Sequence, residues 1–217
     1  MKKTNDPVPG EASFDYSFLV GEPRPGYKLN QLGGPYTIRD YDALPDEIRV
    51  ELIDGIFYDV SAPSVLHQAV CGYIFNQLFS FRMHSGRKCY PMISPLDVQL
   101  DRDDRTVVQP DVIIICDMNK VIGRGIFGAP EFILEVLSPS TRTKDLGIKF
   151  KKYKNAGVLE YWLIDPEKKT LFQFDFRKDA PPAVYDFNAS VPVLVWDGEC
   201  CIDLAEMEKS IAVFRDR

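Results

Sequence analysis

A short apolar segment with one glutamate in its middle constrains the fold of this chain more than any other feature. Residues 132–138 are Phe-Ile-Leu-Glu-Val-Leu-Ser, and they lie between Pro130 and Pro139. An apolar run bounded in this way is typical of a central β-strand that is covered on both faces. Glu135 would then be buried, which is costly unless its carboxylate is paired, hydrogen-bonded or bound to a cation.

A second acid begins a similar apolar run. Asp111 follows Pro110 and precedes Val112–Cys116. Two carboxylates on two adjacent buried strands predict a metal site, because carboxylate oxygens are ligands that hard divalent cations prefer. Two local interpretations stay open: Asp111 could cap the turn after Pro110, and Glu135 could form a structural salt bridge in the core.

Length and composition predict one domain. The chain has 217 residues, of which 45% are hydrophobic and 12% aromatic. Such a chain can bury one core of ordinary size, so we expect a single domain over residues 36–217. Residues 1–35 carry several prolines and glycines without periodicity, which predicts an extended or partly disordered arm.

Charge, cysteine content and the length of apolar runs argue against several classes of protein. No stretch approaches the roughly 18 apolar residues of a membrane span, and the N-terminus has no signal-peptide core, which predicts a cytoplasmic protein without membrane contact. The five cysteines include no C-x-x-C pair, so we expect reduced thiols rather than a disulfide framework or a zinc knuckle. The net charge of −6 argues mildly against nucleic-acid binding driven by overall charge, although a local basic patch can coexist with it.

Sequence periodicity predicts hairpins, two long helices and further strands. Asp54-Gly55 predicts a hairpin within Val50–Val60, after a short helical turn at 37–44. Ser64 is a candidate N-cap for a helix that ends near Gly86, and Gly157 closes a second helix over about 143–156. The other predicted strands are 96–100 and 106–109, which form a second hairpin, and 112–116, 131–137, 161–165, 171–176, 184–187 and 191–196.

A helical wheel orients the second helix. At about 100° per residue, Leu146, Phe150 and Tyr153 form the buried stripe, and Lys149 lies at its edge, where it can lean over the sheet. Asp145, one turn earlier, is the i,i+4 neighbour of Lys149 and could hold it in place. The wheel points three other side chains away from the sheet: Lys144, Ile148 and Lys151. Lys149 could instead be one more solvated charge, since other lysines surround it.

Several motifs occur in a characteristic order. They are Tyr36-Thr37, Glu51–Gly55, His67-Gln68, Ser94–Asp97, Pro110-Asp111, Glu135–Thr141, Asp145–Lys149, Tyr153 and Gly157–Asp165. Their order and spacing resemble the Uma-type restriction endonuclease family, which is part of the PD-(D/E)XK nuclease superfamily. The resemblance covers most of residues 36–176 and is most specific between Glu135 and Asp165.

The resemblance implies a fold and a chemistry. The implied fold class is mixed α/β (α+β), with a restriction-endonuclease-like core, a mixed β-sheet flanked by helices, and β-hairpin additions at both ends. Asp111 and Glu135 are the implied ligands of Mg²⁺ or Mn²⁺, which would activate water for hydrolysis of phosphodiester bonds in DNA. The superfamily's lysine two residues after the glutamate is Leu137 here, and the resemblance implies that Lys149 takes its place. Glu51 matches an additional catalytic acid, although a surface glutamate on a hairpin strand is the plain alternative.

The substrate-binding candidates are His67, Gln109, Arg142, Lys152 and Tyr153. His67 is as easily a histidine at the edge of the core as a base, and Gln109 could orient a metal-bound water or only pair across the sheet. Basic residues of the second helix could neutralise several phosphates, or could form an ordinary solvated face. These are Arg142, Lys144, Lys151, Lys152 and Lys154.

Two functions from different classes follow from these patterns. The first is a metal-dependent DNA endonuclease, or a nuclease that acts on structured or single-stranded nucleic acid. The second is a catalytically silent member of the fold that binds nucleic acid or dimerises, for which Leu137 is the main argument. We expect a homodimer, because the strand at 171–176 and the runs after it add edges to the sheet and because cutting both strands of a duplex requires two sites.

Overall fold

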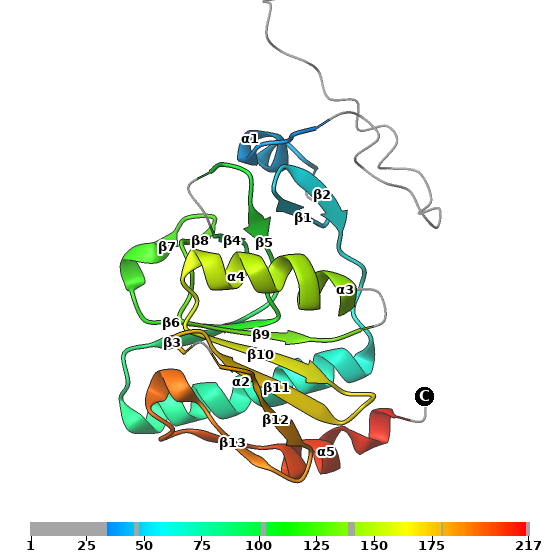
Figure 1. Ribbon diagram of the computed structural model, residues 1–217, viewed down its shortest axis with the longest axis vertical. Helices are drawn as coiled ribbons and strands as arrows, with labels where there is room; N and C mark the ends of the chain where they lie inside the picture. Colours follow the sequence, from blue (N-terminus) through cyan, green and yellow to red (C-terminus); the bar gives the residue numbers. More distant parts are fainter. Residues whose placement is uncertain (1–33, 46–47, 101–102, 139–141, 179, 216–217) are drawn as a thin grey trace, which may run out of the picture.

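The computed structural model describes residues 34–45, 48–100, 103–138, 142–178 and 180–215 (Figure 1). The predicted arm at 1–35 therefore lies almost wholly outside the described residues. The helices are α1 (Ile38–Asp42), α2 (Val65–Ser85), α3 (Arg142–Lys144), α4 (Phe150–Ala156) and α5 (Leu204–Ile211), with a π-helical turn η3 (Asp145–Lys149) and the 3₁₀ turns η2 (Met118–Lys120), η4 (Leu194–Trp196) and η5 (Ala212–Phe214). The strands are β1 (Val50–Ile53), β2 (Ile56–Asp59), β3 (Tyr90–Ile93), β4 (Val98–Gln99), β5 (Val107–Val108), β6 (Val112–Ile115), β7 (Val121–Ile122), β8 (Gly125–Phe127), β9 (Phe132–Val136), β10 (Glu160–Asp165), β11 (Thr170–Asp175), β12 (Ala183–Asp186), β13 (Ser190–Pro192) and β14 (Cys201–Asp203).

A mixed six-stranded sheet forms the centre of the molecule. Its order is β12-β11-β10-β9-β6-β3, and β9 and β10 run parallel while the other neighbours are antiparallel. Every residue of β9 and β10 is buried, as expected of strands that are covered on both faces. Helices α2 and α5 cover one face of this sheet and α4 covers the other (Figure 1). The predicted fold class, a mixed sheet flanked by helices, is confirmed.

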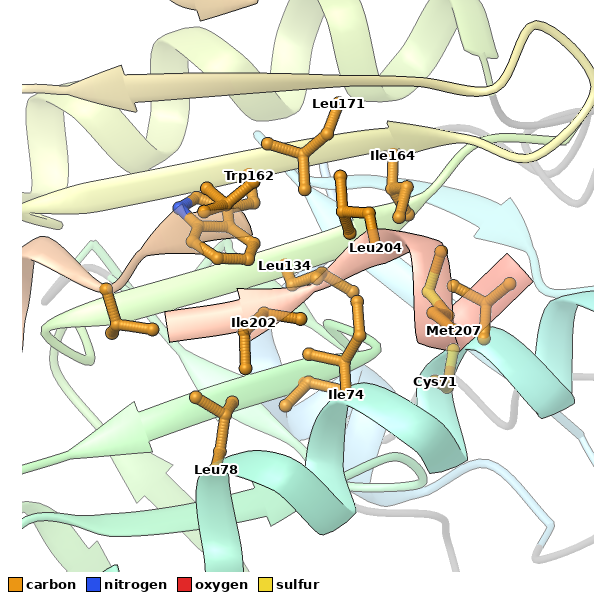
Figure 2. Close-up of a cluster of buried hydrophobic side chains, with 14 of the residues drawn as sticks. Cys71, Ile74, Leu78, Leu134, Trp162, Ile164, Leu171, Ile202, Leu204 and Met207 are labelled. Carbon is orange, nitrogen blue, oxygen red and sulfur yellow. The ribbon is translucent and has the colours of Figure 1, made fainter. Parts of the chain in front are cut away.

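The alternation of side chains along the central strands divides the interior into two cores. Leu134 and Trp162 point to the α2 side, where they pack with Ile74, Leu78 and residues of α5 (Figure 2). Ile133 and Tyr161 point to the α4 side, and they share a core with the second sheet. Full burial of one large aliphatic side chain contributes about 1.5–3 kcal/mol, so both faces of the sheet are anchored by hydrophobic burial.

The second sheet carries the hairpins that the sequence predicts. Its order is β2-β1-β5-β4-β8-β7, with the turn Asp54-Gly55 between β1 and β2. Both turn residues have positive φ, as a tight two-residue hairpin requires. This sheet packs on the α4 side of the central sheet. It brings β1 next to α3 and the π turn η3, which precede α4 and where the site forms.

The long helix α2 begins and ends where the sequence predicts. The Ser64 hydroxyl accepts a hydrogen bond from the backbone N–H of His67, and Gly86 closes the helix in the left-handed conformation. Within the described part of the chain, no helix is both long enough and apolar enough to cross a membrane.

The second predicted helix departs from the helical wheel. A π turn over Asp145–Lys149 interrupts it, and Leu146, placed by the wheel on the buried stripe, is 47% exposed. A π turn carries i→i+5 hydrogen bonds and therefore shifts the phase of the residues that follow it. As a result, Ile148, which the wheel points outward, packs against the core, and Lys149 is fully inside rather than at the edge.

Two further expectations need correction. Cys89 and Cys116 form a disulfide, so the prediction of reduced thiols holds only for Cys71, Cys200 and Cys201. The pairing of β3 with β6 brings the two cysteines together although 27 residues separate them in the sequence. The predicted strand at 191–196 ends at Pro192 and continues as a 3₁₀ turn. Five elements were not predicted from the sequence: β3, β7, β8, β14 and α5.

Candidate active site

A pocket of about 480 Å³ opens where β1, the start of α2, the ends of β6 and β9, and the π turn meet. Six of its lining residues are candidates predicted from the sequence: Glu51, His67, Gln109, Asp111, Glu135 and Lys149. Residues that are up to 98 positions apart in the sequence therefore share one cavity.

Asp111 immediately precedes β6, and its carboxylate is held across the sheet. Its Oδ2 accepts a hydrogen bond of 2.7 Å from the backbone N–H of Val136 and lies 3.3 Å from Nε2 of His67. The pairing of Val112 with Leu134 brings Asp111 next to Glu135, as two adjacent strands predict. The side chain thus bonds to β9 rather than capping its own turn.

Glu135 is buried near the C-terminal end of β9. Its Oε1 accepts a 2.6 Å hydrogen bond from the Tyr153 hydroxyl and lies 2.5 Å from Nζ of Lys149. Burial raises the pKa of Glu135 to about 8, although the positive charge of Lys149 opposes the shift. The negative charges of Asp145 and Asp111 raise it further. Acidic side chains outnumber lysines and arginines in the lining of the pocket, and an excess of negative charge favours a bound cation.

Lys149 projects from the π turn into the space between two acids. Only 3% of its side chain is exposed, so the interpretation as a solvated charge is wrong. Nζ lies 2.8 Å from Oε1 of Glu51 and 3.7 Å from Oδ1 of Asp145, besides its contact with Glu135. Burial would lower the pKa of Lys149, but the surrounding carboxylates outweigh burial and hold the pKa well above its ordinary value. The side chain is therefore a fixed positive charge.

Glu51 is also buried, so the interpretation as a surface glutamate is wrong. Its Oε2 lies 2.5 Å from Nζ of Lys144, and its Oε1 accepts hydrogen bonds from Lys149 and from the backbone N–H of Gln109 at 3.0 Å. Burial raises the pKa of Glu51, but the two lysines outweigh it and lower the pKa to about 2. Glu51 therefore anchors both lysines beside the pocket.

The other substrate-binding candidates divide into two groups. His67 and Gln109 line the pocket, but the Gln109 amide bonds to Tyr41 and Asp97 rather than pointing freely into it. Burial would lower the pKa of His67, and its bond to Asp111 outweighs burial and raises the pKa.

The second group lies outside the lining of the pocket. Arg142 donates a 2.5 Å hydrogen bond to Oδ2 of Asp165, and Lys152 pairs with Asp54 in the β1–β2 turn. Tyr153 is fully buried behind Glu135 and orients that carboxylate.

Two basic residues, Arg49 and Lys144, add to the predicted lining: Arg49 was not predicted, and Lys144 was predicted only as one of several basic residues that could neutralise phosphates. Arg49 precedes Glu51 by two positions, and the two-residue period of a strand puts both on one face, so the predicted hairpin carried the signal. The wheel points Lys144 away from the sheet, whereas the structure pairs it with Glu51 across 93 residues. No local pattern encodes that pairing.

The donor set fits a hard divalent cation. Asp111 and Glu135 contribute carboxylate oxygens from neighbouring strands to a pocket that has room for water and a phosphate group. Mg²⁺ keeps several waters and is commonly bound by one or two carboxylates, which matches this set. These two residues are the ones that would hold the ion.

The mixed sheet, the helices on both faces and the acids at the ends of neighbouring strands define an α/β protein with a nuclease-like fold. A solved structure from Anabaena variabilis, titled as a putative nuclease belonging to DUF820, shares this fold with a TM-score of 0.67. It is 21% identical in sequence, and the similarity covers 82% of this chain and 99% of that chain.

Sequence comparisons identify the family. The "Uncharacterized protein slr1290" of Synechocystis sp. is 27% identical over 141 residues, which is 64% of this chain and 73% of that protein. The profile of the Uma2 family, described as "Putative restriction endonuclease", matches residues 38–191. The chain therefore belongs to the Uma2 family.

Proposed function

We propose that this protein is a metal-dependent endonuclease that hydrolyses phosphodiester bonds in DNA. One observation carries the proposal: Asp111, Glu135 and a buried lysine, Lys149, converge on the same pocket in a member of a restriction endonuclease family. Acidic metal ligands and a fixed cation are the groups that phosphodiester hydrolysis requires, because negative charge accumulates on the phosphoryl oxygens and the leaving oxygen.

Each residue has a definite task in this proposal. Asp111 and Glu135 would hold Mg²⁺ or Mn²⁺, and such a cation supplies Lewis-acid stabilisation and lowers the pKa of an attacking water. Lys149, kept protonated by its carboxylate partners, places a positive charge beside the phosphate. Glu51 fixes the position of Lys149, and the Tyr153 hydroxyl fixes Glu135.

The side chains that line the pocket favour the binding of an anionic substrate. Arg49 and Lys144 bring positive charge to the lining, and Ser61 and Ser64 add small polar side chains near the start of α2. A phosphate backbone is recognised by groups of this kind without reading the base sequence. As further parts of the proposal, the protein acts on DNA as a homodimer in the cytoplasm.

A second candidate function is a catalytically silent nucleic-acid-binding protein. Leu137 stands where the wider superfamily has its lysine, and this side chain is buried in the core on the α4 side, where it offers no charge. The two functions differ in their need for a cation.

Calorimetric titration of the purified protein with Mn²⁺ separates them. The nuclease predicts saturable binding that Asp111→Asn and Glu135→Gln both weaken, whereas Lys151→Ala, on the exposed face of α4, leaves it unchanged. Wild-type protein that binds a DNA duplex but no divalent cation would support the silent member and contradict the nuclease.

A further inference from the structure

A second cluster of metal-binding side chains adjoins the acidic pocket. The ligand atoms of His67, Cys71 and Asp111 all lie within 4.8 Å of one another. His67 and Cys71 are four residues apart on α2, so both project from the same face of the helix. Asp111 reaches the cluster from the residue before β6.

The spacing of the donor atoms fits a tetrahedral ion. Nδ1 of His67 is 3.5 Å from Sγ of Cys71, and Nε2 is 3.3 Å from Oδ2 of Asp111. With Zn–S and Zn–N or Zn–O bonds of about 2.3 and 2.0–2.1 Å, tetrahedral geometry separates neighbouring ligand atoms by about 3.4–3.6 Å. These two distances start from different ring nitrogens, and only one of the two nitrogens would bind the ion. With one nitrogen taken from His67, the three ligand atoms still lie within 4.8 Å of one another.

The chemistry of the donors differs from that of the acidic site. A thiolate, an imidazole and a carboxylate favour Zn²⁺ over Mg²⁺, because sulfur and nitrogen are softer ligands than oxygen. Three protein ligands leave one position of a tetrahedral ion open, as in zinc sites that also bind water or substrate.

The three side chains differ in burial, which leaves the cluster closed on the core side and accessible from the pocket. Cys71 is 2% exposed and projects from α2 into the core that Figure 2 shows. The side chains of His67 and Asp111 are 13% and 17% exposed, and both line the pocket. An ion could therefore enter through the pocket and meet the sulfur at its inner end.

We propose that His67, Cys71 and Asp111 form a site for Zn²⁺ or a similar thiophilic cation, distinct from the two-carboxylate Mg²⁺ site. Binding forms a bond between the metal and Sγ of Cys71 and releases the thiol proton to the buffer. Because Asp111 belongs to both sites, the thiophilic cation competes with Mg²⁺ for that carboxylate. Inhibition of cleavage by Zn²⁺ follows, and this consequence alone rests on the proposed nuclease function.

Titration with Co²⁺ tests the site without reference to cleavage. Co²⁺ has the ligand preferences of Zn²⁺ and gives an intense near-ultraviolet absorption when a thiolate binds it. We expect this absorption in the wild-type protein, reversal by added Zn²⁺, and its loss in Cys71→Ser, a variant of nearly the same size. His67→Gln should lower the affinity for Co²⁺ by roughly 100-fold, which is at least the effect of removing a supporting group around a metal.

Two matched variants locate the signal. Cys201→Ser removes an exposed free cysteine and should keep the absorption. Glu135→Gln should also keep it, while weakening the binding of Mg²⁺. If the wild-type protein gives no thiolate absorption with Co²⁺, or if Cys71→Ser gives the same absorption as wild type while unfolding at the same temperature, the site does not exist. Neither result would affect the Mg²⁺ nuclease proposal, which its own titration and cleavage assays decide.

Discussion

Replacing Lys149 with methionine tests how the buried charges stabilise the protein and how they act in cleavage. Methionine keeps most of the aliphatic stem but removes the ammonium that lies between Glu51 and Glu135. Removing one partner of a buried ion pair typically costs about 3–5 kcal/mol, because the other charge is left uncompensated. In the variant, Lys144 still pairs with Glu51, and Glu135, whose pKa is raised, readily takes up a proton. The cost should therefore lie at the low end of this range.

We therefore expect Lys149→Met to lose about 3 kcal/mol at neutral pH, which lowers the unfolding temperature of a domain of this size by roughly 6–12 °C. The loss should grow as the pH rises through about 8. In that range the wild-type Glu135 ionises next to Lys149, whereas in the variant ionisation of Glu135 remains unfavourable. Thermal unfolding monitored by circular dichroism at several pH values measures both effects.

The same variant should slow cleavage by roughly 10²–10³-fold at a temperature where it is fully folded, since it lacks one preorganised electrostatic donor. Its affinity for Mn²⁺ should not fall, because Lys149 is not a ligand. Lys151→Met, on the exposed face of the same helix, is the control for both measurements. If the two variants unfold at the same temperature and cleave equally well, the reasoning about Lys149 is wrong.

Other variants test separate parts of the structure. Tyr153→Phe removes the hydrogen bond to Glu135 and should weaken Mn²⁺ binding by roughly 10–100-fold in calorimetry; unchanged affinity would show that the hydroxyl does not position the ligand. Asp165 has a lowered pKa: burial opposes the shift, but hydrogen bonds from Arg142 and the backbone outweigh it. The ionised Asp165 therefore adds to the free energy of unfolding above its ordinary pKa of 3.8, and this contribution is lost as the pH falls through its lowered pKa in the folded protein. Arg142→Ala should cost about 1 kcal/mol at pH 7 and progressively less at acidic pH in urea unfolding, and a difference that does not change with pH would contradict the ion pair. A homodimer is expected by light scattering at micromolar concentration, with a strictly monomeric mass as the contrary result.

The sequence predicted the parts of the site that depend on local pattern. Asp111 and Glu135 were predictable because each belongs to an apolar strand with clear boundaries, and Glu51 because Asp54-Gly55 defines its hairpin. The two ends of α2 were predictable because a capping serine and a left-handed glycine mark them.

The predictions that were wrong concern geometry that no local sequence pattern encodes. The π turn changed the faces of Leu146, Ile148 and Lys149 relative to a regular helix. The partners of Arg142 and Lys152 depend on how distant elements pack, so a basic cluster that was expected to bind phosphate proved to be partly engaged in ion pairs. The Cys89–Cys116 disulfide likewise depends on the pairing of β3 with β6, which no local sequence pattern indicates.

The most direct test of the account is cleavage of a supercoiled plasmid by the purified protein in Mg²⁺, compared with the same reaction in excess chelator and with the Asp111→Asn and Glu135→Gln variants. The account predicts nicked or linear product for the wild-type protein only when the cation is present, and a rate that falls by at least about 10²-fold in each variant. Cleavage that persists at the wild-type rate in Glu135→Gln, or the absence of product from well-folded wild-type protein that binds Mg²⁺, would contradict it.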